Sequence, residues 1–221
     1  MNVLILGATK GLGKEITFEC LSKGFDTIEL GSSIDENQVN ENRIFINCNL
    51  LSTDSVNETI LKLKKIDKID CFFWVAGRIL KGDFSDYNTE EILNTIDVNF
   101  RNAIPLIHYI WTRMLQSKQE SKFIAIASSA GKKPKPDESI YVATKFAQVG
   151  FVRSLGMAAG ESKTKVSLIL PGGMKTQLWD SYPTNDYCSF NDPSKVAKKI
   201  FNFIEVQKKS YEELEIPRGS V

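Results

Sequence analysis

The chain has 221 residues, 42% of them hydrophobic and 25% charged, and a formal net charge of +1. This length suits one domain with a sizeable core, so we expect a single domain over residues 1–221. A net charge near zero does not favour nucleic acid as a partner, and no apolar run is long enough to cross a bilayer. The first expected strand begins at Asn2 and leaves no room for a secretory signal, so we expect a cytoplasmic protein.

A glycine-rich turn separates the first expected strand from the first expected helix. The apolar run 3–6 is typical of a buried parallel strand, and Gly7, Gly11 and Gly13 follow it. Glycines are needed in such a turn because a side chain would keep the backbone away from a pyrophosphate. The helix behind the turn directs its N-terminal amides and its dipole toward phosphate. The segment is therefore a candidate cradle for a dinucleotide.

Strands and helices alternate along the rest of the chain. The expected strands are 2–6, 26–30, 43–47, 70–75, 122–127 and 165–170, and a short seventh strand near 213–216 fits the pattern. The expected helices are 12–23, 53–66, 89–117, 139–160 and 192–207. We expect residues 217–221 to be flexible. The alternation predicts an α/β fold, a Rossmann-like doubly wound three-layer sandwich with a central parallel sheet of six to seven strands.

Four further motifs follow the glycine turn, and their order identifies a family. They are Asp97-Val98-Asn99, Ser128 three residues before Gly131, Tyr141-Val142-Ala143-Thr144-Lys145, and Pro171-Gly172-Gly173-Met174-Lys175-Thr176. Together with Gly-x-x-x-Gly-x-Gly they resemble the short-chain dehydrogenase/reductase family over nearly the whole chain. A Tyr-x-x-x-Lys pair alone is often an ordinary pair on a helix surface, but Ser128 lies thirteen residues before Tyr141, as the family requires.

The resemblance implies a catalytic set of Ser128, Tyr141, Lys145 and Asn99. A free tyrosine has a pKa of about 10, so it needs a nearby cation to exchange protons at neutral pH. Lys145 lies one helical turn from Tyr141 and is expected to lower the pKa of the phenol. Ser128, rather than Ser129, would bond the substrate oxygen, and Asn99 would hold a water that links Lys145 to solvent.

The resemblance also implies which residues hold a nicotinamide cofactor. They are Gly7, Thr9, Lys10, Gly11, Leu12, Gly13, Ser32, Asn49, Leu50, Ala76, Gly77, Tyr141, Lys145, Pro171, Gly172, Met174 and Thr176. NAD users carry an acidic residue at the end of the second strand, where this chain has Gly31. Lys10 stands in the loop where a basic residue can meet a ribose phosphate, so NADP(H) is favoured over NAD(H).

Several positions depart from the family pattern, and one of them is Asn49, which stands where the family commonly has an aspartate that contacts the adenine. Leu6 replaces a threonine, and Trp74 replaces an asparagine that ties the central strands together, so a different local hydrogen-bond solution is expected. The one histidine and the four scattered cysteines lack the spacing of metal ligands, so no metal is expected. Cys20, Cys48 and Cys71 lie in apolar surroundings and are expected to be buried thiols.

The substrate end of the sequence is less informative. Segment 177–191 would form a lid, and its aromatic residues either line a substrate pocket or pack the lid onto its own protein. A basic rim, defined as Arg78, Lys81, Lys132, Lys133 and Lys135, would attract an anionic substrate or would simply be solvated.

These observations predict an NADP(H)-dependent oxidoreductase that interconverts a ketone or aldehyde and its alcohol. The alternatives are an NAD-dependent alcohol dehydrogenase and a non-catalytic NADP-sensing protein on the same fold. The resemblance also implies a homodimer or homotetramer that pairs through segments 99–117 and 139–160.

Overall fold

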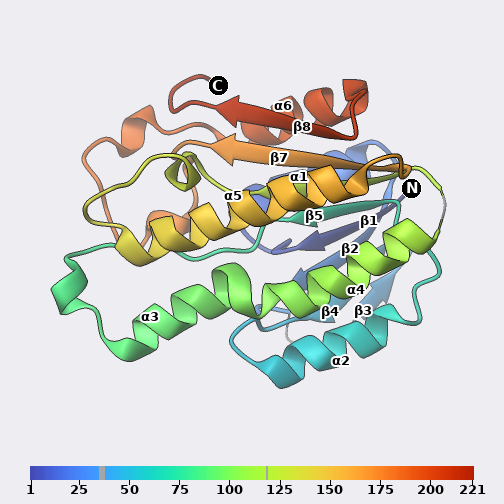
Figure 1. The fold of residues 1–221 in the computed structure, drawn as a ribbon, viewed down its shortest axis with the longest axis horizontal. Helices are drawn as coiled ribbons and strands as arrows, with labels where there is room; N and C mark the ends of the chain where they lie inside the picture. The colour runs from blue at the N-terminus through green and yellow to red at the C-terminus, as the bar shows by residue number, and fades with distance from the viewer. Residues whose placement is uncertain (35–37, 118) are drawn as a thin grey trace.

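A computed structural model describes residues 1–34, 38–117 and 119–221. Within these residues the strands form one eight-stranded sheet in the order β3-β4-β2-β1-β5-β6-β7-β8 (Figure 1). The strands are β1 (Asn2–Leu6), β2 (Asp26–Gly31), β3 (Gln38–Asn40), β4 (Arg43–Asn47), β5 (Cys71–Trp74), β6 (Ser121–Ile126), β7 (Thr164–Pro171) and β8 (Tyr211–Ile216).

The predicted doubly wound α/β fold is confirmed, and the sheet is one strand wider than expected. All neighbouring strands pair in parallel except β3, which runs antiparallel to β4 at the edge. The three residues of β3 are all exposed, so no apolar run marks this strand in the sequence. The suggested seventh strand is β8, and it begins two residues earlier than its predicted start at 213.

Helices cover both faces of the sheet. They are α1 (Gly11–Ser22), α2 (Thr53–Leu63), α3 (Thr89–Ile96), α4 (Ala103–Gln116), α5 (Ser139–Ala159) and α6 (Pro193–Val206). In Figure 1, α2, α4 and α5 lie in front of the sheet, and α1 and α6 lie behind it. None of the helices within the described residues is long and apolar enough to cross a membrane.

The core consists of two apolar layers because successive side chains of a strand point to opposite faces. Leu4 and Leu6 of β1 pack in the layer with α2, α4 and α5. Val3 and Ile5 of the same strand pack in the layer with α1 and α6. Burial on both faces explains why these strands read as continuous apolar runs in the sequence.

The predicted helix 89–117 is divided by a π-helical segment, Asp97–Arg101, between α3 and α4. The amide of Asn102 donates to the carbonyl of Asp97 at 3.1 Å, five residues back. A π turn inserts a residue without ending the helix, and such turns are frequent at functional sites. The sequence could not show the division because the residues on both sides keep the helical apolar pattern.

Two glycines of α5 allow a matched test of the packing of α5 against β8. A Cβ at Gly156 would lie 2.3 Å from the ring of Tyr211, whereas a Cβ at Gly150 meets nothing within 4 Å. We expect Gly156→Ala to lower the free energy of unfolding by about 1–3 kcal/mol through overpacking. Gly150→Ala should raise it by about 0.5–1 kcal/mol, because alanine favours the helix. Urea unfolding measures both changes, and shifts of the same sign would contradict this packing.

Candidate active site

A cleft of about 1030 Å³ opens at the carboxyl ends of the parallel strands. Ligands of open α/β sheets bind at this end, where loops from several strands meet. The glycine loop after β1, the loops after β5 and β6, the start of α5 and the segment after β7 all border the cleft. The glycine loop, Ser128, Tyr141, Lys145 and the segment that begins at Pro171 therefore border one cleft, whereas Val98 of the Asp97-Val98-Asn99 motif lines it and Asn99 is buried behind it.

The glycine loop is folded too tightly to accept side chains at Gly7 and Gly13. Gly7 and Gly11 have φ values of +93° and +49°, which favour glycine. A Cβ at Gly7 would lie 2.6 Å from the amide nitrogen of Ala76, and a Cβ at Gly13 would lie 1.8 Å from the carbonyl oxygen of Gly7. Lys10 precedes α1 without capping it by its side chain, so the first amides of α1 are left for another acceptor. This backbone cradle suits a phosphate group.

The segment after β7 forms the opposite wall of the cleft. A Cβ at Gly11 would lie 3.1 Å from Cβ of Thr176, so this segment approaches the glycine loop closely. A Cβ at Gly172 would lie 2.7 Å from the amide nitrogen of Arg218, which belongs to the terminal segment 217–221. That segment was expected to be flexible, but Asn191 Nδ2 donates to the carbonyl of Pro217 at 2.8 Å and holds it in place.

Lys10 and Ser32 border the same end of the cleft, and both are exposed. Lys10 has no ion pair within the described residues. The carboxylate of Glu29, on β2, is turned away from the cleft and bonds to Arg43 at 2.7 and 2.9 Å. The side-chain oxygen of Asn49 accepts from the amide of Leu51 at 3.0 Å, which leaves its amide group for an acceptor in the cleft.

Ser128 and Tyr141 face each other across the cleft floor. Ser128 is half-buried and stands at the start of the short turn η3 (Ser129–Gly131), where its hydroxyl accepts from the amide of Ala130 at 3.1 Å. Ser129 is exposed instead. Burial raises the pKa of Tyr141 to about 12, a hydrogen bond from Ser128 lowers it in part, and the charge of Glu138 raises it further.

Lys145 lies beside Tyr141 as the sequence predicted. Its ammonium nitrogen is 5.6 Å from the centre of the Tyr141 ring. Burial lowers the pKa of Lys145 to about 7, because the side chain is 3% exposed and water no longer stabilises the charge. The expected lowering of the phenol pKa by Lys145 is not found, because Lys145 is not among the groups that shift this pKa and burial raises it. A Cβ at Gly77 would lie 3.4 Å from the lysine nitrogen, so the nitrogen points at that wall of the cleft.

Asn99 lies within the π-helical segment and joins two parts of the site. Its side-chain oxygen accepts from the amide of Arg78 at 2.7 Å, and its amide group donates to the carbonyl of Arg78 at 2.9 Å. The same amide group donates to the hydroxyl of Thr144 at 2.9 Å. The main-chain oxygen of Asn99 accepts from Gln148 at 2.8 Å. Sequence reasoning missed Gln148, although it lies seven residues after Tyr141 and therefore on the same helix face.

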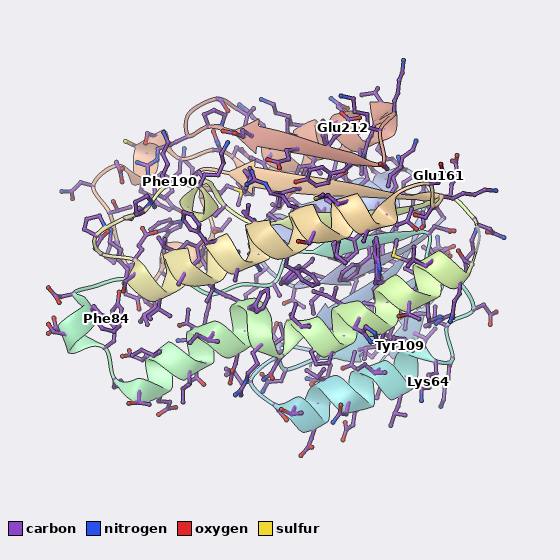
Figure 2. The ribbon with its side chains drawn as sticks, viewed as in Figure 1. Lys64, Phe84, Tyr109, Glu161, Phe190 and Glu212 are labelled. Atoms are coloured by element: carbon purple, nitrogen blue, oxygen red, sulfur yellow. The ribbon has the colours of Figure 1, made fainter. Side chains whose placement is uncertain are left out.

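The lid residues divide between the two expected roles. Leu178, Trp179 and Tyr182 pack with Tyr141 and border the cleft. Phe190 is buried against the ring of Trp179, with the ring centres 5.1 Å apart, and so anchors the lid. Figure 2 shows Phe190 on the loop before α6, beyond the arrowhead of β7.

Ion pairs occupy much of the basic rim. Lys81 pairs with Asp137 at 2.9 Å, Lys135 pairs with Glu138 at 2.9 Å, and Lys132 pairs with Glu215. Within the described residues, Arg78 and Lys133 are the rim cations without such a pair. The attraction of this rim for an anion is therefore weaker than the five basic residues in the sequence suggest.

The strand end at Trp74 shows how the chain manages without the family's asparagine. Backbone amides of Val75 and Ala76 donate to the carbonyl of Leu6 at 2.9 and 2.8 Å and join β5 to β1. The indole of Trp74 packs among Phe100 and Phe151, and its N–H has no partner within the described residues. In place of the asparagine bond, backbone hydrogen bonds and aromatic packing therefore join the central strands at this point, and no new side-chain hydrogen bond among the described residues replaces it.

Comparisons with known proteins found similar sequences and similar folds. An uncharacterised oxidoreductase of Schizosaccharomyces pombe is 24% identical over 94% of this chain and 79% of its own. The rat 15-hydroxyprostaglandin dehydrogenase [NAD(+)] is 26% identical over 91% of this chain and 80% of its own. The solved structure of ElxO with NADP bound has a TM-score of 0.84 at 23% identity and covers 99% of this chain and 98% of its own.

A family model decides the assignment. The model of the short chain dehydrogenase family matches residues 1–186, which include the glycine loop, Ser128, Tyr141 and Lys145. The solved structures, at this identity, show the fold alone. The chain therefore belongs to the short-chain dehydrogenase family and is an oxidoreductase of that family.

Proposed function

We propose that this protein uses NADP(H) to interconvert a ketone or aldehyde and its alcohol by hydride transfer. The observation that carries this proposal is the convergence of Ser128, Tyr141 and Lys145 on one cleft that the glycine loop also borders. An alcohol oxidation removes a proton and a hydride, so it requires a proton acceptor next to a hydride acceptor. The buried Tyr141 would be the proton acceptor, and the glycine-loop cradle suits a cofactor that accepts the hydride.

The residues of the cleft fit a nicotinamide dinucleotide. The glycine loop leaves no space for a Cβ at Gly7 or Gly13, and the amides that begin α1 are directed at the cradle, as a pyrophosphate requires. Such a cofactor, when bound, supplies or accepts the hydride at its nicotinamide ring. Lys145 would hold its ribose hydroxyls, and Thr176 and Met174 would lie along the ring.

NADP(H) is our preferred cofactor because of the charge at the outer end of the cleft. A ribose phosphate needs cations or polar donors, and Lys10 and Ser32 are both exposed there. The similar proteins include one described with NADP and one described with NAD(+), so the family alone does not decide between the two.

Ser128, Tyr141 and the lid residues would have different roles in the reaction. The hydroxyl of Ser128 would donate to the substrate oxygen and fix its position. The phenol of Tyr141 would give its proton to that oxygen during reduction and take it back during oxidation. Leu178, Trp179 and Tyr182 would exclude water from the reacting carbon, and their apolar surfaces favour a substrate with a ring or an alkyl chain.

We also propose that copies of the chain assemble through α4 and α5 as a homodimer or homotetramer. Leu115, Phe146 and Met157 are exposed apolar residues on these helices, and Met157 is 83% exposed. Contact between copies would cover them. An anionic substrate would depend on Arg78 and Lys133, the rim cations without an ion pair within the described residues.

Tyr141→Phe tests the proton-transfer role. We expect this variant to lower kcat for reduction of a panel of ketones and aldehydes by about a hundredfold or more, because the phenol is the proton donor. Loss of NADPH absorbance measures the rate, and thermal shift should still detect NADPH binding. Tyr109→Phe, on α4 and outside the cleft, is the matched control and should keep the wild-type rate. Full activity of Tyr141→Phe would remove the tyrosine from the mechanism.

Lys10→Ala tests the choice of cofactor. We expect the variant to bind NADPH about tenfold more weakly while NADH binding stays the same, because a charged contact to one phosphate is lost. Titration calorimetry with each cofactor gives the four affinities. Lys14→Ala is the control, since Lys14 is an exposed lysine in the first turn of α1, four residues after Lys10, and does not border the cleft. Equal affinity of the wild type for NADH and NADPH would refute the preference.

The burial of Lys145 makes the stability of the ligand-free protein depend on pH. Its pKa falls from 10.5 to about 7 on folding. Between these two values the unfolded chain binds a proton that the folded chain lacks, so stability rises with pH in this range. Below about pH 7 both states carry the proton, and the folded state then bears the full cost of the buried charge.

Lys145→Met should therefore stabilise the ligand-free protein most at low pH. We expect its Tm to exceed that of the wild type at pH 6 and the difference to shrink steadily toward pH 10. Thermal unfolding at pH 6, 8 and 10 measures this. Lys133→Met removes an exposed lysine and should give a difference that does not change with pH. A constant difference for Lys145→Met as well would mean that Lys145 is solvated in the folded state.

A further inference from the structure

Gln148 is a buried polar residue that the proposed reaction does not yet use. It lies on α5 three residues after Lys145 and seven after Tyr141, so the three side chains share one face of the helix. It is 1% exposed, and the neighbouring positions Val149 and Val152 on this helix are buried apolar residues. A primary amide costs free energy in such surroundings unless both its oxygen and its nitrogen are hydrogen-bonded.

Both ends of this amide are bonded, and each bond reaches a residue of the candidate site. The oxygen Oε1 accepts from the ammonium of Lys145 at 2.8 Å. The nitrogen Nε2 donates to the main-chain oxygen of Asn99 at 2.8 Å. Gln148 therefore bridges α5 and the π-helical segment, and Lys145 is fixed at one end of the bridge.

The bridge provides a hydrogen-bond acceptor for a buried ammonium. An ammonium carries three donors, and Gln148 accepts one of them. Lys145 borders the cleft, and its nitrogen points toward Gly77, so the other donors are left for a ligand there. An amide oxygen stabilises the protonated lysine without neutralising it, which a carboxylate would do.

Charged and titratable groups lie on α5 and on the elements that pack against it, and most of them are ion-paired. On α5 these are Tyr141 and, just before the helix, Glu138, which pairs with Lys135. The elements that pack against α5 contribute Asp97 paired with Arg101, Arg78 after β5, Lys132 paired with Glu215, and Glu213 of β8 paired with Arg153. Burial is the cause that lowers the pKa of Lys145.

We propose that Gln148 is a positioning residue, whose amide ties the ammonium of Lys145 to the main-chain oxygen of Asn99 and aims the remaining donors of the ammonium at the cleft. This inference rests on the proposed function for its catalytic meaning. It also changes the expected proton path. Gln148 already bonds the main-chain oxygen of Asn99, the residue expected to hold the water that links Lys145 to solvent, and an amide does not release its protons as water does. Proton exchange at Tyr141 then passes through the open side of the cleft.

The first test measures the pKa of Lys145 directly in the ligand-free protein. Lysines labelled with carbon-13 at Cε are titrated by NMR, and Lys145→Arg identifies the signal. We expect Gln148→Met, which keeps the length and removes the acceptor, to lower the pKa of Lys145 by about one unit of pH. Gln148→Glu keeps an acceptor for the ammonium and should leave this pKa at the wild-type value or above it. An unchanged pKa in Gln148→Met, or a lowered one in Gln148→Glu, would overturn the proposal.

A packing control separates positioning from loss of stability. Val152→Ala removes buried methyl groups from the same helix without touching Lys145, and it should lower Tm but leave the pKa of Lys145 unchanged. An equal change of this pKa in Val152→Ala and Gln148→Met would mean that general loosening of α5 explains the effect. The proposal would then fail.

Kinetics supply the second test. We expect Gln148→Met to lower kcat about tenfold and to move the alkaline limb of the pH profile of kcat/KM to lower pH, because Lys145 loses its proton sooner. Gln148→Glu should restore the limb, and Val152→Ala should not move it. A limb that stays in place in Gln148→Met would overturn the positioning role. If the wild type reduces no ketone or aldehyde, the proposed function fails, and the NMR titration still decides whether Gln148 holds Lys145.

Discussion

The hydrogen bonds of Asn99 determine how the two halves of the site meet. Its side chain holds both the amide and the carbonyl of Arg78 on the loop after β5, and it bonds Thr144 on α5. The distance between that loop and α5 fixes how closely Lys145 approaches Gly77. The π turn makes this possible, since one inserted residue turns Asn99 inward without interrupting the long helix. The geometry of the candidate site thus depends on an irregularity of the backbone.

The sheet could be predicted from the sequence because its strands are buried on both faces and read as apolar runs. The parallel direction of the strands could be predicted because strands and helices alternate along the chain. Edge strand β3 could not be predicted in this way, since Gln38, Val39 and Asn40 are exposed and gain their structure from pairing with β4 alone. The π turn was also hidden, because apolar periodicity reports which face is buried and not the number of residues in each turn.

Site residues could be predicted where a sequence motif marks them. They could not be predicted where their role depends on a hydrogen-bond partner that is distant in the sequence. Motif spacing placed Ser128, Tyr141 and Lys145, which the structure brings to one cleft. Gln148 belongs to no motif, and its role follows from two hydrogen bonds that depend on tertiary structure. Trp74 illustrates the same point, because its change from the family pattern is absorbed by packing against Phe100 and Phe151, which sequence spacing does not reveal.

Desolvation, and not pairing of opposite charges, sets the protonation of this site. Burial raises the pKa of Tyr141 to about 12 and lowers that of Lys145 to about 7, so burial pushes both groups toward their neutral forms. A counter-charge such as a carboxylate next to Lys145 would hold its proton in every state of the protein. A neutral acceptor such as Gln148 leaves the protonation of Lys145 responsive to whatever enters the cleft. Under the proposed function, ligand binding itself would establish the electrostatics that favour proton transfer, and the reactivity of Tyr141 would then depend on an occupied site.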